Sequence, residues 1–166
     1  MSTRSNIIIK VKPEDIGKTI SFDKKKLPHP VELSDWDEGQ KSDEFSEPVK
    51  IEKDYLCIYC HWDGYPSGIG AALLENFNDY DSVLNLIAGG SCSYVETKSV
   101  KHYANRLGEE WKYLKPKQAN QPEPYSCWTE YAYIFEDGKW FVGVVKTLKD
   151  KKSEGIYNIV ELTDNM

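Results

Sequence analysis

Residues 57–70 hold the densest group of side chains that can do chemistry, Cys57-Ile-Tyr-Cys-His-Trp-Asp-Gly-Tyr-Pro-Ser-Gly-Ile-Gly70. His61, Asp63 and Tyr65 alternate along the chain, and in a continuing strand they would share one face. A histidine beside a carboxylate can have its tautomer fixed and its pKa raised, as general-base work requires. His61 and Asp63 are therefore the candidate catalytic pair, and with Tyr65 they are candidates for holding a small polar ligand. A purely structural turn over residues 63–66 stays open as the alternative.

A helix is expected to start directly after this loop, at Ser67-Gly68-Ile69-Gly70. The first N–H groups of a helix are unsatisfied and carry partial positive charge, so they suit a phosphate or carboxylate. Ser67, Gly68 and Gly70 are ligand-binding candidates on this ground. The glycines can equally allow close packing of the helix on a sheet. The spacing matches neither the dinucleotide fingerprint nor the Walker loop.

Arginine is scarce in this chain, because only Arg4 and Arg106 stand among 21 basic residues. Arginine is suited to planar, bidentate recognition of a carboxylate or phosphate. Arg4, at the start of the first expected strand, is therefore a further ligand-binding candidate. A structural ion pair is the alternative for both arginines.

The Cys57-x-x-Cys60-His61 spacing invites a zinc or haem interpretation. In a strand, however, Cys57 and Cys60 point to opposite faces, which is poor for chelation. A second paired set of ligands is missing, since Cys92 and Cys127 stand alone. We therefore predict no metal and no cofactor, and we interpret the cysteines as buried thiols.

The 166 residues fit one domain with a polar, acidic insertion at about residues 23–48. Residues 32–54 hold nine acidic residues and three lysines, and so account for the whole net charge of −6. No general basic field remains, so direct DNA binding is not expected. The acidic segment either contacts a basic partner surface or is a solvated loop. The candidate partner-binding residues are Asp35, Asp37, Glu38, Asp43 and Glu44.

No apolar run approaches the roughly 20 residues that span a bilayer. The first residues, Met-Ser-Thr-Arg-Ser, show no signal-peptide pattern. We therefore expect a cytoplasmic protein without membrane contact, with reduced cysteines.

Hydrophobic periodicity predicts strands and three amphipathic helices. The expected strands cover residues 6–12, 16–22, 49–61 and 156–162, and the expected helices cover 67–77, 79–88 and 99–107. Residues 128–145 form a predicted hairpin around the turn Asp137-Gly138, which sets Glu136 opposite Lys139. Both faces of this hairpin are largely apolar, which indicates a central hairpin covered on both faces, or covered by helices on one face and by a loop or partner on the other. The two apolar faces also allow a homodimer without requiring one. The predicted fold is α+β, a mostly antiparallel sheet of about five strands with two or three helices on one face.

Four stretches of the chain carry a family resemblance: Met-Ser-Thr-Arg-Ser at 1–5, Ile-Tyr-Cys-His-Trp-Asp-Gly-Tyr-Pro at 58–66, the segments 78–80 and 86–90, and Glu-Tyr-x-Tyr-x-Phe-x-Asp-Gly-Lys-Trp at 130–140. In these the chain resembles small uncharacterised proteins of phages, prophages and Gram-positive bacteria. The resemblance implies an accessory protein of a mobile element, working in the cytoplasm of a bacterial host cell. Accessory proteins of that origin often bind host factors or signalling nucleotides.

We therefore expect a binding protein rather than an enzyme, which captures a host protein or a small anionic ligand such as a nucleotide. An anti-defence role, as an inhibitor, fits this expectation. The alternative is a small hydrolase or transferase that acts on a nucleotide or phosphoester through His61 and Asp63. A third hypothesis, a DNA-mimic inhibitor, rests on the acidic segment alone.

Overall fold

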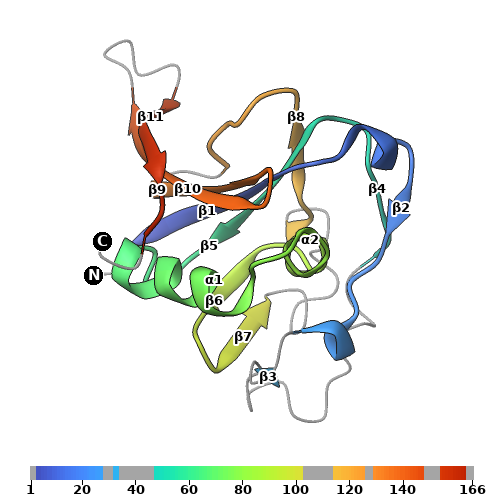
Figure 1. Ribbon diagram of the computed structural model, residues 1–166, viewed down its shortest axis with the longest axis horizontal. Helices are drawn as coiled ribbons and strands as arrows, with labels where there is room; N and C mark the ends of the chain where they lie inside the picture. Colours follow the sequence, from blue (N-terminus) through green and yellow to red (C-terminus); the bar gives the residue numbers. More distant parts are fainter. Residues whose placement is uncertain are drawn as a thin grey trace.

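A nine-stranded mixed sheet forms the centre of the fold (Figure 1). The computed structural model describes residues 3–27, 32–33, 47–102, 114–125, 129–147 and 154–163. The strands of this sheet are β1 (Arg4–Lys10), β3 (Glu32–Leu33), β5 (Tyr55–Cys60), β6 (Cys92–Val95), β7 (Ser99–His102), β8 (Lys117–Ala119), β9 (Thr129–Glu136), β10 (Lys139–Thr147) and β11 (Glu154–Glu161). Their order is β11-β10-β9-β1-β5-β6-β7-β3, with β8 also paired to β5. A separate ladder joins β2 (Thr19–Ile20) to β4 (Val49–Lys50).

The sheet corrects the predicted fold, which is wrong in both the size of the sheet and the direction of its strands. β1 pairs antiparallel with β5 and parallel with β9, and the β5–β6 and β3–β7 pairs are also parallel. Strands as short as β3 and β8 give no periodic pattern that a sequence can reveal. The parallel pairing of β1 with β9 joins segments far apart in the sequence, so no local sequence pattern predicts it.

Two short helices follow β5 and cover one face of the sheet (Figure 1). A π-helical turn, η5 (Pro66–Gly70), leads into α1 (Ala71–Asn76), and α2 (Tyr80–Ala88) comes next. The predicted apolar stripe is confirmed, because Ile69, Ala72, Leu73 and Phe77 are all fully buried. Asp79 is the N-cap of α2, since its side chain accepts a hydrogen bond from the Ser82 amide at 2.7 Å.

The predicted helix from Ser99 is wrong over its first four residues, which form β7 and pair with β6. Val100 and His102 alternate along β7, so they share one face of the strand, and both are fully buried. The remaining residues of that prediction, 103–107, lie outside the described residues.

The predicted hairpin is confirmed in its turn and in its register. Glu136 pairs with Lys139 and Phe135 pairs with Trp140. Asp137 has φ 53° and Gly138 has φ 78°, as the primed two-residue turn requires. The hairpin is inside the sheet, with β1 on one side and β11 on the other.

The sheet has two apolar faces of unequal size. The large core lies between the sheet and the helices and includes Ile7, Ile9 and Cys60. The smaller cluster on the opposite face holds Ile8 and Cys57, with partly buried residues such as Tyr125 packed against it. Cys57 and Cys60 therefore point to opposite faces, as strand geometry predicted.

Part of the predicted insertion is described. The described part contains the turn η2 (Lys24–Lys26) and the strand β3. An earlier turn, η1 (Pro13–Asp15), precedes the insertion. The predicted partner-binding residues Asp35, Asp37, Glu38, Asp43 and Glu44 lie outside the described residues. Among the helices that the structure describes, none is long and apolar enough to cross a membrane.

Candidate functional site

Three neighbouring strands bring a row of polar side chains together at one end of the sheet. The β1–β5 ladder ends with Ser5 opposite Cys60, so Arg4 and His61 are the next residues on the two strands. On its other side Arg4 pairs with Thr129 of β9, where an irregularity shifts the register. We call Arg4, Tyr59, His61, Trp62 and Thr129 the sheet-end cluster.

Two members of the sheet-end cluster, Arg4 and Tyr59, lie on the face of the sheet that the helices do not cover. Side chains alternate along β1, so Arg4 shares a face with Ile8, which is in the smaller apolar cluster. Tyr59 lies on this face as well, since it alternates with Cys57 on β5. Neither Tyr59 nor Thr129 was singled out in the sequence, because their proximity to Arg4 depends on strand order.

His61 is held by aromatic neighbours. Its Nδ1 lies 2.7 Å from the Tyr59 hydroxyl, so one of these groups donates a hydrogen bond to the other. Its ring meets the edge of the Trp62 ring with centroids 4.7 Å apart, and its amide donates to the Cys92 carbonyl at 3.1 Å. These contacts fix the ring at the end of the sheet.

The pKa of His61 is lowered, first by burial and then by the positive charge of Arg4. The expected rise of this pKa is therefore wrong. The hydrogen-bond partner of the ring at Nδ1 is the phenol of Tyr59, whereas a raised pKa requires a carboxylate that stabilises the charged form. His61 is neutral at neutral pH, and it offers the site a hydrogen-bond donor or acceptor rather than a charge.

Asp63 and Tyr65 form a pair of their own on the loop. β5 ends at Cys60, and Asp63 has φ 56°, in the left-handed region, so the alternation of a strand does not continue through it. The expectation that His61, Asp63 and Tyr65 share a strand face is wrong for this reason. The Tyr65 hydroxyl donates to an Asp63 carboxylate oxygen at 3.4 Å.

The loop is tied to the sheet through Gly64. Its amide donates to the Thr3 carbonyl at 2.8 Å, and its carbonyl accepts a hydrogen bond from the Tyr133 hydroxyl at 2.6 Å. A Cβ at this position would lie 2.8 Å from both the Ser5 side chain and the Thr3 carbonyl oxygen. The backbone of the loop therefore touches β1 closely, and only glycine fits there.

Two amides at the start of η5 already donate hydrogen bonds to carbonyl groups of the preceding loop. The Gly68 amide donates to the Tyr65 carbonyl at 2.9 Å, and the Ile69 amide donates to the Asp63 carbonyl at 2.8 Å. A Cβ on Gly68 would collide with the Asp63 carbonyl oxygen. A Cβ on Gly70 would lie 3.3 Å from the Leu162 side chain. This geometry favours a packing role for Gly68 and Gly70, with Ser67 exposed beside them.

Arg4 and Thr129 have polar groups left for a ligand. Within the described part of the chain, no carboxylate lies within ion-pair distance of Arg4. The Thr129 side chain is buried, and its hydroxyl has no hydrogen-bond partner among the described residues. A buried hydroxyl without a partner costs free energy, so such groups are commonly explained by a bound water, ion or ligand. Arg106 and its surroundings lie outside the described residues.

The thiols near the site are poorly suited to nucleophilic chemistry. Burial raises the pKa of Cys60 to about 12 and also raises the pKa values of Cys57 and Cys92. A thiol in such an environment stays protonated and inert. Across the described ranges, no group of three or more His, Cys, Asp and Glu side chains is placed to hold a metal ion.

Comparison of the chain with family models, with curated proteins and with solved structures finds no match. The chemistry that the sheet-end cluster can perform is therefore inferred from its own residues. The cluster suits an anion that carries an aromatic ring. It offers a guanidinium, an imidazole, a buried hydroxyl and an indole that is 46% exposed.

Proposed function

We propose that this protein is a binding protein, encoded by a phage or another mobile element, that captures a small anionic ligand at the sheet-end cluster. It would act in the cytoplasm of a bacterial host cell and withhold the ligand from a host process, which is an anti-defence role. The observation that carries the proposal is the placement of Arg4, without a described carboxylate partner, between His61 and the unpartnered hydroxyl of Thr129.

The chemistry of the cluster favours one anionic group. Arg4 supplies the only fixed positive charge, since the pKa of His61 is lowered and its ring is neutral at neutral pH. The planar guanidinium can hold a phosphate or carboxylate with two parallel hydrogen bonds. Trp62 and Tyr65 are 46% and 41% exposed and offer aromatic surfaces nearby. A ligand with an aromatic ring next to its anionic group would use both features.

An acidic side chain on a host protein would present the same chemistry to Arg4. The experiment that separates the two occupants is native mass spectrometry of the full chain, purified gently from bacterial cells. A carried small molecule appears as a fixed mass increment, and a protein partner appears as a larger complex. Arg4→Gln should lose either adduct, whereas Lys98→Gln, at an exposed position on the β6–β7 turn, should keep it.

One observation favours an enzyme as the second candidate. A histidine that is neutral at neutral pH is ready to accept a proton, and burial together with Arg4 keeps His61 in that form. The predicted partner Asp63, however, makes its hydrogen bond with Tyr65. Incubation of the chain with bis(p-nitrophenyl) phosphate tests this alternative: turnover that disappears in His61→Gln would favour the hydrolase over the binding protein.

A further inference from the structure

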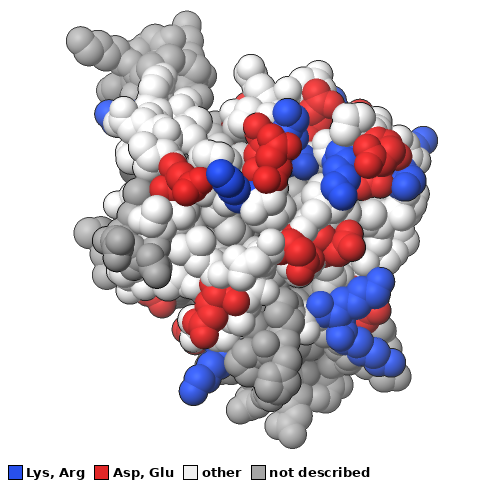
Figure 2. All heavy atoms as spheres, viewed as in Figure 1, with Lys and Arg blue, Asp and Glu red and all other residues white. Residues whose placement is uncertain are grey.

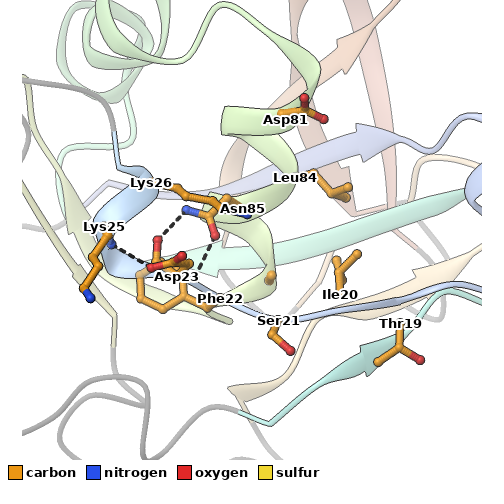
Figure 3. A pocket seen from close by; sticks show the side chains of 11 residues that line it. Thr19, Ile20, Ser21, Phe22, Asp23, Lys25, Lys26, Asp81, Leu84 and Asn85 are labelled. Atoms are coloured by element: carbon orange, nitrogen blue, oxygen red, sulfur yellow. Dashed lines mark hydrogen bonds between the residues drawn. The ribbon is translucent and has the colours of Figure 1, made fainter.

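A cavity of about 820 Å³ lies between α2 and the segment that runs from β2 to η2 (Figure 3). This volume is within the range of about 300–1,000 Å³ typical of small-molecule sites. The cavity does not include the sheet-end cluster, and neither its position nor its residues were suggested by a sequence motif. Its walls are partly apolar, from Ile20 on β2 and from Leu84 and Ala88 on α2.

The wall formed by η2 is rigidly attached to α2. Asn85 is 8% exposed, and its side chain accepts a hydrogen bond from the Asp23 amide at 2.9 Å and donates one to the Asp23 carbonyl at 3.0 Å. The Asp23 carboxylate in turn accepts from the Lys25 amide at 2.9 Å (Figure 3). These bonds fix the backbone that carries Lys25 and Lys26, so the position of the two lysines is built into the fold.

Four charged residues line the cavity: Asp23, Lys25, Lys26 and Asp81. Lys25 and Lys26 line it from η2, and neither has an ion pair with a described residue. Lysine atoms gather at the lower right of the molecular face in Figure 2, where Figure 1 shows the short blue turn η2. Asp81 lines the cavity from α2, about one turn before Leu84 and Asn85 (Figure 3). The cavity therefore offers two cations, an apolar wall and two carboxylates, and the Asp23 carboxylate is already engaged by the Lys25 amide.

We propose that this cavity is a second ligand site, which binds a nucleoside monophosphate. The phosphate would lie against Lys25 and Lys26, because ammonium groups bind phosphate as point charges. The base would lie on the apolar wall of Ile20 and Leu84, and the ribose hydroxyls would donate to Asp81. Simple inorganic phosphate would use only the lysines, and a nucleoside would use only the other walls, so the nucleotide binds more tightly than either.

The probe is adenosine monophosphate, titrated into the full chain by isothermal calorimetry, with adenosine and inorganic phosphate titrated separately. The double variant Lys25→Ala/Lys26→Ala should weaken binding of the nucleotide by about tenfold or more. The variant Leu84→Gln should weaken binding of the nucleotide and leave binding of inorganic phosphate unchanged. Lys53→Ala/Lys98→Ala removes the same charge from exposed positions elsewhere and is the matched control.

Binding that is lost in the two cavity variants and kept in the control supports the proposal. Two results would overturn it: equal affinity of the cavity double variant and the control, or equal affinity of inorganic phosphate and the nucleotide for the wild type. The test is independent of the proposed function, since Arg4→Gln leaves this cavity intact. Loss of nucleotide binding in Arg4→Gln alone would assign the nucleotide to the sheet-end cluster instead.

Discussion

Arg4 and His61 are the next residues beyond the last pair of the β1–β5 ladder, Ser5 and Cys60, and the charge of Arg4 acts on the His61 ring. The charge of Arg4 opposes protonation of His61 and adds to the effect of burial, which is the larger cause of its lowered pKa. The pair thus combines one permanent cation with one neutral ring. Such a combination binds an anion without the pH dependence that a charged histidine would bring.

Replacement of Arg4 by Gln should raise the pKa of His61 toward its ordinary value, because the opposing positive charge is removed. The rise should be partial, since burial of the ring remains. An NMR titration of the histidine ring protons in the wild type and the variant measures it. An unchanged or lower pKa in Arg4→Gln would show that the two side chains do not interact.

The Thr129→Val variant separates a binding role from a structural one. Valine has nearly the shape of threonine and removes a buried hydroxyl that has no described partner. The free energy of unfolding should therefore stay equal or rise by about 1 kcal/mol, as measured in urea. Binding at the sheet-end cluster should weaken at the same time. A destabilised variant would mean that the hydroxyl has a structural partner, and the site would lose one of its members.

Gly64→Ala should destabilise the protein by about 1–3 kcal/mol, because the added Cβ meets the Ser5 side chain and a backbone carbonyl. Gly70→Ala should cost less, since its nearest neighbour is the end of the flexible Leu162 side chain at 3.3 Å. Urea unfolding of both variants checks the order. Equal losses would indicate that the loop moves away from β1 without cost.

His102 should make the protein sensitive to acid. Its ring is fully buried between Phe22 and the backbone at Gly89, and its Nε2 donates to the Leu86 carbonyl at 2.9 Å. Burial lowers the pKa of His102 from 6.5 to about 4 in the folded protein. The unfolded chain therefore binds a proton first as the pH falls, and stability is lost between about pH 6.5 and pH 4.

The loss from this residue should be on the order of 3 kcal/mol over that range. His102→Gln keeps an N–H donor for the Leu86 carbonyl and removes the titrating group. The difference in free energy of unfolding between the wild type and this variant should shrink as the pH falls. A difference that is constant with pH would show that His102 does not titrate between the two states.

Local patterns in the sequence were good guides to single elements. The Asp137-Gly138 turn fixed the whole β9–β10 register, because a two-residue turn allows one alignment. The apolar periodicity of residues 67–77 and 79–88 placed the two helices, since periodicity acts over a few residues. The size of the sheet was missed because it depends on pairing between distant segments.

The candidate site shows the same limit. His61 and Arg4 were both selected by residue type, yet their proximity follows from the antiparallel register of β1 with β5. Asp63 was expected to support His61 by alternation, and its left-handed backbone ended that alternation. Thr129 had no signal of its own, because only the parallel pairing of β9 with β1 brings it beside Arg4.

The most direct test of the central claim is a site-resolved NMR titration with inorganic pyrophosphate near neutral pH. The variant Lys25→Ala/Lys26→Ala serves as the starting protein, so that the cavity beside α2 does not contribute. We predict saturable shifts of the His61 ring and of the Trp62 indole, and affinity at least about tenfold weaker once Arg4→Gln is added. Shifts that do not saturate, or that are the same with and without Arg4, would contradict an anion site at the end of the sheet.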